Sequence, residues 1–215
     1  LHDYNTKSFK DSRLVQLFDR FATYNGSSPY QTPGIMSMIP HLEQYYGTFF
    51  PKGGMHSITE SVYKLAQDLG VHFYFNSTVN RIHIENQIAV GISVNNKDFY
   101  GDFIISNSDV IPTYKNLIKD QKPPLKILKQ PRSSSALIFY WGIKKEFPSL
   151  DLHNIFFSDN YEKEFTYIFE KKKVYNDPTI YVNITSKENK SDAPKGCENW
   201  FVMVNVPSNN GQNWD

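Results

Sequence analysis

The chain carries its clearest structural signal in the segment Phe50-Pro-Lys-Gly-Gly-Met-His-Ser-Ile-Thr-Glu-Ser-Val-Tyr-Lys-Leu-Ala-Gln-Asp-Leu-Gly70. Gly53 and Gly54 have no Cβ, so they can adopt positive φ angles and let a flat or charged ligand approach the main chain. Apolar residues at helical spacing follow, and Gly70 is placed to end that helix. The runs 71–75 and 77–82 then predict strands. This order is typical of nucleotide-binding enzymes, although a tight turn alone would also explain the glycine pair.

The residues before this segment predict helices. Asp11 or Ser12 can cap a first helix that stops near Gly26. The apolar face expected for that helix consists of Leu14, Leu17, Phe18 and Phe21. A second helical stretch is expected after Pro33, with a kink or restart at Pro40 and an end at Gly47.

Short alternating runs follow the helix, and they predict a small antiparallel meander from about residue 79 to residue 99. The all-apolar run 103–105 then predicts a strand buried on both faces. Ser106 and Asn107 come directly after it, where α/β sheets usually bind ligands.

A proline-bearing stretch, 119–132, suggests a crossing between structural units. Beyond it, strands are expected at 133–142, 154–158, 179–185 and 200–206, with a helix near 161–169. The predicted fold class is therefore α+β or α/β, with a mixed or antiparallel sheet and aromatic faces.

Composition excludes several classes of function. The 215 residues are 40% hydrophobic and 15% aromatic, which is ample for a packed core, and a formal charge of +1 gives no general argument for nucleic acid. Cys197 is the only cysteine and the six histidines are scattered, so we assign no disulfide framework and no metal site. No apolar run approaches the roughly 20 residues of a spanning helix. The chain starts at Leu1 and stops after a strand-like segment, so we expect a fragment of a longer protein.

An ordered set of sequence blocks resembles the bacterial carotenoid desaturases, the phytoene desaturase and hydroxycarotenoid 3,4-desaturase type of the flavin amine oxidase superfamily. The matching blocks are Asp11-Ser-Arg-Leu-Val-Gln-Leu-Phe18, Tyr24-Asn-Gly-Ser-Ser-Pro-Tyr30, Phe50-Pro-Lys-Gly-Gly-Met55, Asn107-Ser-Asp109 with Tyr114, Ser133-Ser-Ser-Ala-Leu137, His153-Asn154, Asp177-Pro-Thr179 and Ala193-Pro-Lys-Gly196. They cover nearly the whole chain.

The resemblance implies noncovalent FAD and removal of hydrogen beside a polyene, which needs a redox-active ring because side chains cannot take a hydride from an unactivated carbon. It implies that Gly53, Gly54 and Met55 lie beside the isoalloxazine ring, that Val79 faces the adenine, and that Ser106 and Asn107 lie near the nucleotide. The alternative interpretations are a plain core residue for Val79 and a simple turn for Ser106 and Asn107. The implied organisation is a helical part of a substrate domain at 1–49, a portion of a Rossmann-like FAD domain at 50–118, and a strand-rich substrate domain at 119–215.

The family pattern is also incomplete here. Neither a GxGxxG fingerprint nor a glycine-rich C-terminal flavin segment is present, so the chain resembles the middle of a desaturase and is not expected to hold FAD tightly or turn over alone. His153 is expected to be a hydrogen-bonded structural residue, because Leu152 stands where many relatives carry a second histidine. No catalytic acid or base is assigned, and Asp109 and Glu43 are candidates only through their matching blocks.

The implied substrate is an apolar polyene that resides in a bilayer, so we expect peripheral attachment to the inner face of a bacterial cell membrane, in the cytoplasm. Aromatic residues expected to line a substrate tunnel are Phe139, Tyr140, Trp141, Phe156 and Phe157. Two other classes stay open. One is a related flavin oxidase or isomerase acting on another lipid or retinoid, and the other is a non-enzymatic binder of apolar ligands, which would have no use for the glycine loop. The particular carotenoid, the electron acceptor and the oligomeric state are not indicated.

Overall fold

The computed structural model describes residues 1–119, 121–209 and 211–214. The chain divides into two compact units, one formed by residues 1–48 with 132–215 and the other by residues 49–131. The first unit therefore joins the N-terminal helices to the strand-rich C-terminal part. Assignment of the units to substrate and flavin domains remains a prediction.

The first unit begins with α1 (His2–Ser8), α2 (Ser12–Asp19), η1 (Arg20–Asn25), η2 (Gly34–Ser37) and α3 (Met38–Tyr46). Asp11 caps α2 by accepting a hydrogen bond from the Arg13 amide at 2.9 Å, and Gly26 ends η1 in the left-handed conformation, as expected. The expected restart lies two residues before Pro40: η2 ends at Ser37, α3 begins at Met38, and Pro40 stands in the first turn of α3.

The apolar face predicted for α2 was wrong. Val15, Asp19 and Ala22 are buried, whereas Leu14 and Leu17 are about two-fifths exposed. The side chains of His2 and Asn5 bind the Asp19 carboxylate at 2.7 and 2.8 Å, so a satisfied polar group replaces an apolar one at the contact between α1 and α2. A pattern based on hydrophobicity alone cannot find such a face.

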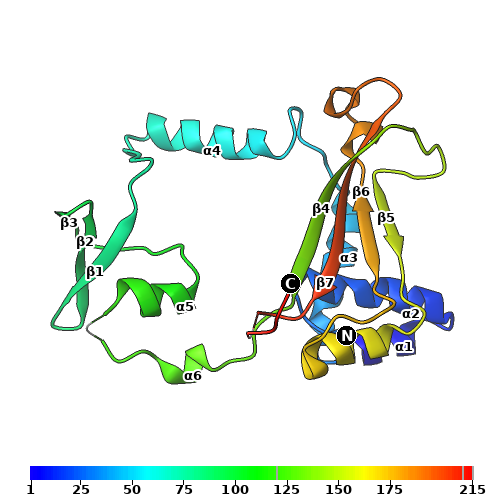
Figure 1. Ribbon diagram of the computed structural model, residues 1–215, viewed down its shortest axis with the longest axis horizontal. Helices are drawn as coiled ribbons and strands as arrows, with labels where there is room; N and C mark the ends of the chain where they lie inside the picture. The colour runs from blue at the N-terminus through cyan, green and yellow to red at the C-terminus, as the bar shows by residue number, and fades with distance from the viewer. Residues whose placement is uncertain (120, 210, 215) are drawn as a thin grey trace. The chain divides into compact units, whose positions relative to one another are not determined.

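A four-stranded antiparallel sheet forms the rest of the first unit (Figure 1). It consists of β4 (Ser135–Ile143), β5 (His153–Phe156), β6 (Ile180–Asn183) and β7 (Glu198–Val206) in the order β4-β7-β6-β5. Val182, Ile184 and Val202 make its buried core, against which Leu150 and Trp200 pack. Between β5 and β6 lie α7 (Tyr161–Thr166) and η4 (Tyr167–Lys171), which confirm the helix expected there.

The second unit contains α4 (His56–Asp68) and a three-stranded meander of β1 (Val79–Glu85), β2 (Ile88–Val94) and β3 (Lys97–Tyr100). Two-residue turns at 86–87 and 95–96 have positive φ at both positions, which is the turn that matches the twist of an antiparallel hairpin. Gly91 in β2 is required, because a Cβ there would lie 2.5 Å from the Phe99 carbonyl oxygen. After the meander come α5 (Val110–Pro112), η3 (Thr113–Leu117) and α6 (Leu125–Leu128), and η3 packs against β1.

Two expected strands are not formed. Residues 71–75 and 103–105 are extended or turn segments without strand pairing, and Phe103 and Ile105 are about nine-tenths exposed. A strand buried on both faces needs neighbouring strands and covering helices. The described part of the second unit pairs only its three meander strands, so these apolar runs lack the partners that would make them strands.

Across the described ranges, every helix is too short or too polar to cross a bilayer. Nor do the described histidine, cysteine and acidic side chains gather into a group of three that could hold a metal ion.

Candidate functional site

The glycine loop before α4 has the backbone geometry that a flat cofactor needs. Gly53 and Gly54 have φ angles of +86° and +79°, a region that other residues enter only with strain. A Cβ added at Gly54 would meet no atom within 4 Å, and one at Gly53 would only contact the Ser57 side chain at 3.6 Å. The main chain of the loop is therefore open to a ligand.

Local hydrogen bonds hold this loop at the start of α4. The Gly54 amide donates to the Pro51 carbonyl at 3.0 Å, and the Ser57 hydroxyl donates to the Gly54 carbonyl at 2.7 Å. Met55 is the N-cap residue of α4, and its side chain is exposed. These residues fit a flavin that lies against the turn, and their role in binding it stays a prediction.

The other residues expected near the nucleotide lie in one part of the second unit. Val79 is half-buried at the start of β1. The Ser106 hydroxyl lies 3.2 Å from the hydroxyl of Thr113, a buried residue of η3, and η3 packs against β1. Asn107 is exposed in the segment before α5. Thr113 therefore connects the Ser106 segment to the strand that carries Val79, but the strand end expected beneath Ser106 and Asn107 is absent.

The five aromatic residues expected to line a tunnel do not share one surface. In the sheet register, Phe139 and Trp141 lie on the same face as Phe156, because Phe139 is aligned with Val202 and Phe156 with Ile180. Tyr140 lies on the opposite face, as alternate residues of a strand must. Phe157 follows β5 and packs edge-on against the Tyr161 ring at 5.7 Å. One tunnel cannot use all five, which corrects the expectation for the set.

A cavity of about 550 Å³ opens on the Tyr140 face of the sheet. Strands β5, β6 and β7 contribute His153, Ile155, Tyr181 and Met203, and the N-terminal helices contribute Arg20, Thr23, Tyr24 and Glu43. We call it the sheet–helix cavity. Ile155 and Met203 give it an apolar wall, and four polar side chains form two hydrogen-bonded pairs beside that wall.

The first pair is Tyr24 and Glu43. The Tyr24 hydroxyl donates to the Glu43 carboxylate at 2.7 Å. Burial, together with this hydrogen bond, raises the pKa of Tyr24 to about 12, so the phenol keeps its proton near neutral pH. One carboxylate oxygen of Glu43 is therefore oriented by Tyr24, and the other can accept a further hydrogen bond.

The second pair is His153 and Tyr181. Burial raises the pKa of Tyr181, so its hydroxyl stays protonated, and it lies 2.8 Å from His153 Nδ1; the direction of this hydrogen bond follows the tautomer of His153. The Asn183 amide lies 3.2 Å from the same nitrogen. With Nδ1 as acceptor, a neutral His153 carries its proton on Nε2 and can donate it. His153 is hydrogen-bonded, as expected, and the cavity also offers one donor and one acceptor to a ligand.

Sequence reasoning missed this cavity as a site. Tyr24 and His153 each lie in a quoted block and Glu43 was named as a candidate, but the two pairs join residues 19 and 28 positions apart. The aromatic content of β4 drew attention instead to the strand at the edge of the sheet. Pairing of a tyrosine with an acceptor on another element leaves no periodic signal in a sequence.

Comparisons with known proteins agree with the fold and the blocks. Residues 2–135 match the family model described as flavin containing amine oxidoreductase. The chain is 57% identical over 213 residues to a 1-hydroxycarotenoid 3,4-desaturase of a Flavobacterium species, covering 99% of this chain and 44% of that protein. It is 32% identical to a phytoene desaturase of Cercospora nicotianae, over 93% of this chain and 33% of that protein.

A crystal structure of an oxidoreductase from Methanosarcina mazei shares the fold with a TM-score of 0.70 and 16% identity, covering 97% of this chain and 47% of that one. The chain thus spans less than half the length of these relatives. The family match includes the glycine loop and the whole second unit, and it extends over more than half of the chain. This chain belongs to the flavin-containing amine oxidoreductase family.

Proposed function

We propose that this chain is the central part of an FAD-dependent carotenoid desaturase that introduces a 3,4 double bond into a 1-hydroxycarotenoid. The observation that carries the proposal is the 57% identity, over 99% of the chain, to a 1-hydroxycarotenoid 3,4-desaturase. Identity to a phytoene desaturase is 32% over a similar share of the chain. The difference favours a hydroxylated substrate over phytoene.

The cofactor of this family is a flavin, FAD. When bound, it supplies the electron-accepting ring that amino-acid side chains cannot replace. Gly53 and Gly54 would hold it through open main chain at positive φ, and Met55 would cover it from the helix start. These residues bind and position the ring, and no described residue is assigned a proton-transfer role.

The sheet–helix cavity supports the choice of a hydroxylated substrate. A carotenoid is apolar along its length, and a tertiary hydroxyl is its only polar group in this substrate class. The wall formed by Ile155 and Met203 suits the hydrocarbon, while Glu43 can accept the hydrogen bond of a hydroxyl and His153 Nε2 can donate one. A site built to bind a hydroxyl discriminates strongly against an analogue that lacks it, because its own polar groups are then left unpaired.

We also propose that the protein docks on the inner face of the cell membrane to collect its substrate. Two aromatic residues form the end of α3: Tyr45 is 72% exposed and Tyr46 67%. Aromatic side chains with one polar edge favour the membrane interface. Replacing Tyr45 and Tyr46 by serine should weaken flotation with neutral phosphatidylcholine vesicles, and unchanged flotation would remove the support.

The test of the function uses the complete polypeptide that contains this chain, loaded with FAD and mixed with vesicles that carry either a 1-hydroxycarotenoid or phytoene. A red-shifted polyene spectrum with the hydroxylated substrate alone is the expected result. A shift with phytoene alone would replace the proposal by phytoene desaturation. Bound flavin without any shift would assign another lipid oxidoreductase, and no bound flavin would leave a binder of apolar ligands.

The role of the cavity is tested separately with Glu43→Gln. The variant should raise KM for the hydroxylated carotenoid by about tenfold with a smaller change in kcat, since a hydrogen bond to a charged acceptor contributes about 1.5–3 kcal/mol. Glu85→Gln, on an exposed strand end, is the matched control. Equal KM values for both variants would show that Glu43 does not contact the hydroxyl.

A further inference from the structure

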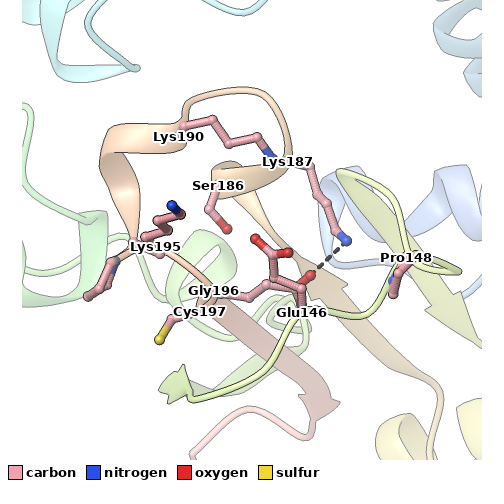
Figure 2. A pocket seen from close by; sticks show the side chains of 11 residues that line it. Glu146, Pro148, Ser186, Lys187, Lys190, Lys195, Gly196 and Cys197 are labelled. Atoms are coloured by element: carbon pink, nitrogen blue, oxygen red, sulfur yellow. Dashed lines mark ion pairs between the residues drawn. The ribbon is translucent and has the colours of Figure 1, made fainter.

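A second cavity of the first unit has no part in the proposed desaturation. It measures about 450 Å³ and lies between the segment after β4 and the segment between β6 and β7. The residues that line it are Glu146, Pro148, Ser186, Lys187, Lys190, Ala193, Pro194, Lys195, Gly196, Cys197 and Glu198. Three of them are lysines, and Figure 2 shows these lysines around Ser186. We call it the lysine pocket.

One of the lysines is already neutralised. Lys187 Nζ lies 2.7 Å from the Glu198 carboxylate and also donates to the Phe147 carbonyl at 2.7 Å. Glu198 in turn accepts from the Trp200 indole at 2.8 Å and from the Phe147 amide at 2.9 Å. Burial raises the pKa of Glu198, but these hydrogen bonds outweigh it and lower the pKa overall, so the group is an anion matched to Lys187. Neither charge of this pair is available to a ligand.

Lys190 and Lys195 are different. Both are exposed at the rim, and neither makes an ion pair or hydrogen bond with another residue in the described ranges. Lys190 is the first residue of the short turn η6 (Lys190–Asp192). Lys195 comes directly before Gly196, which has a φ of +77°. Apart from Glu198, the lining contains one carboxylate, Glu146, which is also exposed. The unmatched charge of the lining is therefore positive.

Ser186 provides an independent sign of a ligand. It is 4% exposed, and among the described residues its hydroxyl is a buried group without a hydrogen-bond partner. Its amide is fixed by the Asn199 side chain at 2.9 Å, which holds the residue at the base of the pocket. In Figure 2 the Ser186 side chain lies among the lining side chains, with Lys195 on one side, Lys187 and Lys190 on the other, and a glutamate carboxylate beside its hydroxyl. Buried polar groups are nearly always paired in proteins, so an unpaired hydroxyl here indicates a partner from outside the chain.

We propose that the lysine pocket binds a phosphate group, with Lys190 and Lys195 neutralising its charge and Ser186 donating a hydrogen bond to one oxygen. A phosphate oxygen is a strong acceptor, and ammonium groups bind it as point charges. The phosphate belongs either to a phospholipid headgroup or to a free phosphate compound. Both sources present the same oxygens to the pocket.

The test uses the flavin-loaded complete polypeptide in two arms. The first arm titrates inorganic phosphate against potassium chloride of equal ionic strength and follows the change in melting temperature. The second arm measures co-sedimentation with phosphatidylcholine vesicles that contain or lack phosphatidylglycerol. Lys190→Gln with Lys195→Gln is compared with the α6 variant, Lys126→Gln with Lys129→Gln, which removes one exposed charge from α6 and one from the residue directly after it.

The pocket variant should weaken binding by about tenfold per lysine relative to the α6 variant, as expected for charge-assisted hydrogen bonds. Binding of the phosphatidylglycerol vesicles that depends on Lys190 and Lys195, without a response to inorganic phosphate, would assign the phosphate to an anionic lipid headgroup, and a response to inorganic phosphate would assign a free compound. Equal losses in the two double variants, or no response in either arm, would overturn the proposal.

Ser186→Ala separates a ligand from a structural defect. The variant should lose most of the rise in melting temperature that phosphate produces, while its melting temperature without phosphate stays equal or increases, because an unpaired buried hydroxyl has been removed. A phosphate response equal to that of the unchanged protein would show that Ser186 does not contact the ligand and would refute its part in the site.

Discussion

Replacing Gly26 by alanine should destabilise the first unit strongly, because two independent constraints meet at this residue. Gly26 has a φ of +60°, and a Cβ there would lie 2.8 Å from the Ser133 Cβ. Its carbonyl also accepts the Ser134 amide at 2.7 Å, immediately before β4. The end of the N-terminal helices is thus attached to the start of the sheet, so neither side can move away freely.

The size of the effect follows from these two constraints. The left-handed conformation costs an alanine roughly 1–2 kcal/mol. Overpacking at a rigid contact costs about 1–3 kcal/mol more, and the lower entropy of the unfolded alanine chain offsets about 0.4–1 kcal/mol. We therefore expect Gly26→Ala to lower the free energy of unfolding by about 1–4.6 kcal/mol.

Urea unfolding followed by tryptophan fluorescence measures this change, with Trp200 in the sheet as a reporter. Gly142→Ala is the matched control, since Gly142 lies in β4, has no positive φ, and its added Cβ would meet nothing within 4 Å. Combining Gly26→Ala with Ser133→Gly should restore the stability lost through the contact between the two Cβ atoms, and the loss caused by the positive φ should remain. If Gly26→Ala and Gly142→Ala differ by less than about 0.5 kcal/mol, the reasoning is wrong.

The remaining predictions concern charge, cofactor and turn geometry. Burial makes the pKa of Glu164 higher in the folded state than in the unfolded state, so the unchanged protein loses stability as pH rises through these values. Glu164→Gln should therefore gain stability relative to the unchanged protein in urea melts between about pH 4 and pH 8. A stability difference that stays constant with pH would contradict this. The pKa of Glu198 is lower in the folded state, so its contribution to the free energy of unfolding is present above the pKa of the unfolded state and is lost as pH falls. The loss of stability caused by Glu198→Gln should therefore become smaller as the pH of the urea melts is lowered. Gly54 and Gly70 both have positive φ and open space for a Cβ, so their alanine variants carry similar backbone strain. Only Gly54→Ala should weaken FAD binding in a fluorescence titration. Equal FAD affinities of the two variants would place the flavin elsewhere. Asn96→Gly, at a φ of +62°, should raise the melting temperature by a few degrees in calorimetry, and no rise would mean that the turn carries no strain.

Local signals predicted the local elements well. The helix after the glycine pair, the meander with its polar turns and the four strands of the larger sheet all form where hydrophobic period and turn residues indicated. Each of these elements is specified by neighbours in the sequence: Asp11 caps α2, Gly26 ends η1, and the asparagines at positions 95 and 96 adopt the positive φ of a tight hairpin. The helix α1 was missed, because polar residues fill it and its contact depends on Asp19.

Signals that depend on distant partners were less reliable. The runs 71–75 and 103–105 read as strands because strands buried on both faces are uniformly apolar, yet a run can pair only if another strand lies beside it. The aromatic residues of β4 read as one lining, although alternation places Tyr140 opposite to Phe139 and Trp141. The pairs Tyr24–Glu43 and His153–Tyr181 are invisible in one sequence, because nothing local records which acceptor a tyrosine will meet.

The helix α4 has a consequence for how the protein must be made. Its apolar stripe of Ile58, Val62, Leu65 and Leu69 is between 48% and 76% exposed, and no residue of the helix is buried among the described residues. An uncovered stripe of this kind is an adhesive surface during synthesis, when neighbouring ribosomes hold many copies at high local concentration. Overproduction of the chain is therefore expected to give inclusion bodies, and slower translation, which lowers the concentration of newly made copies, should reduce them.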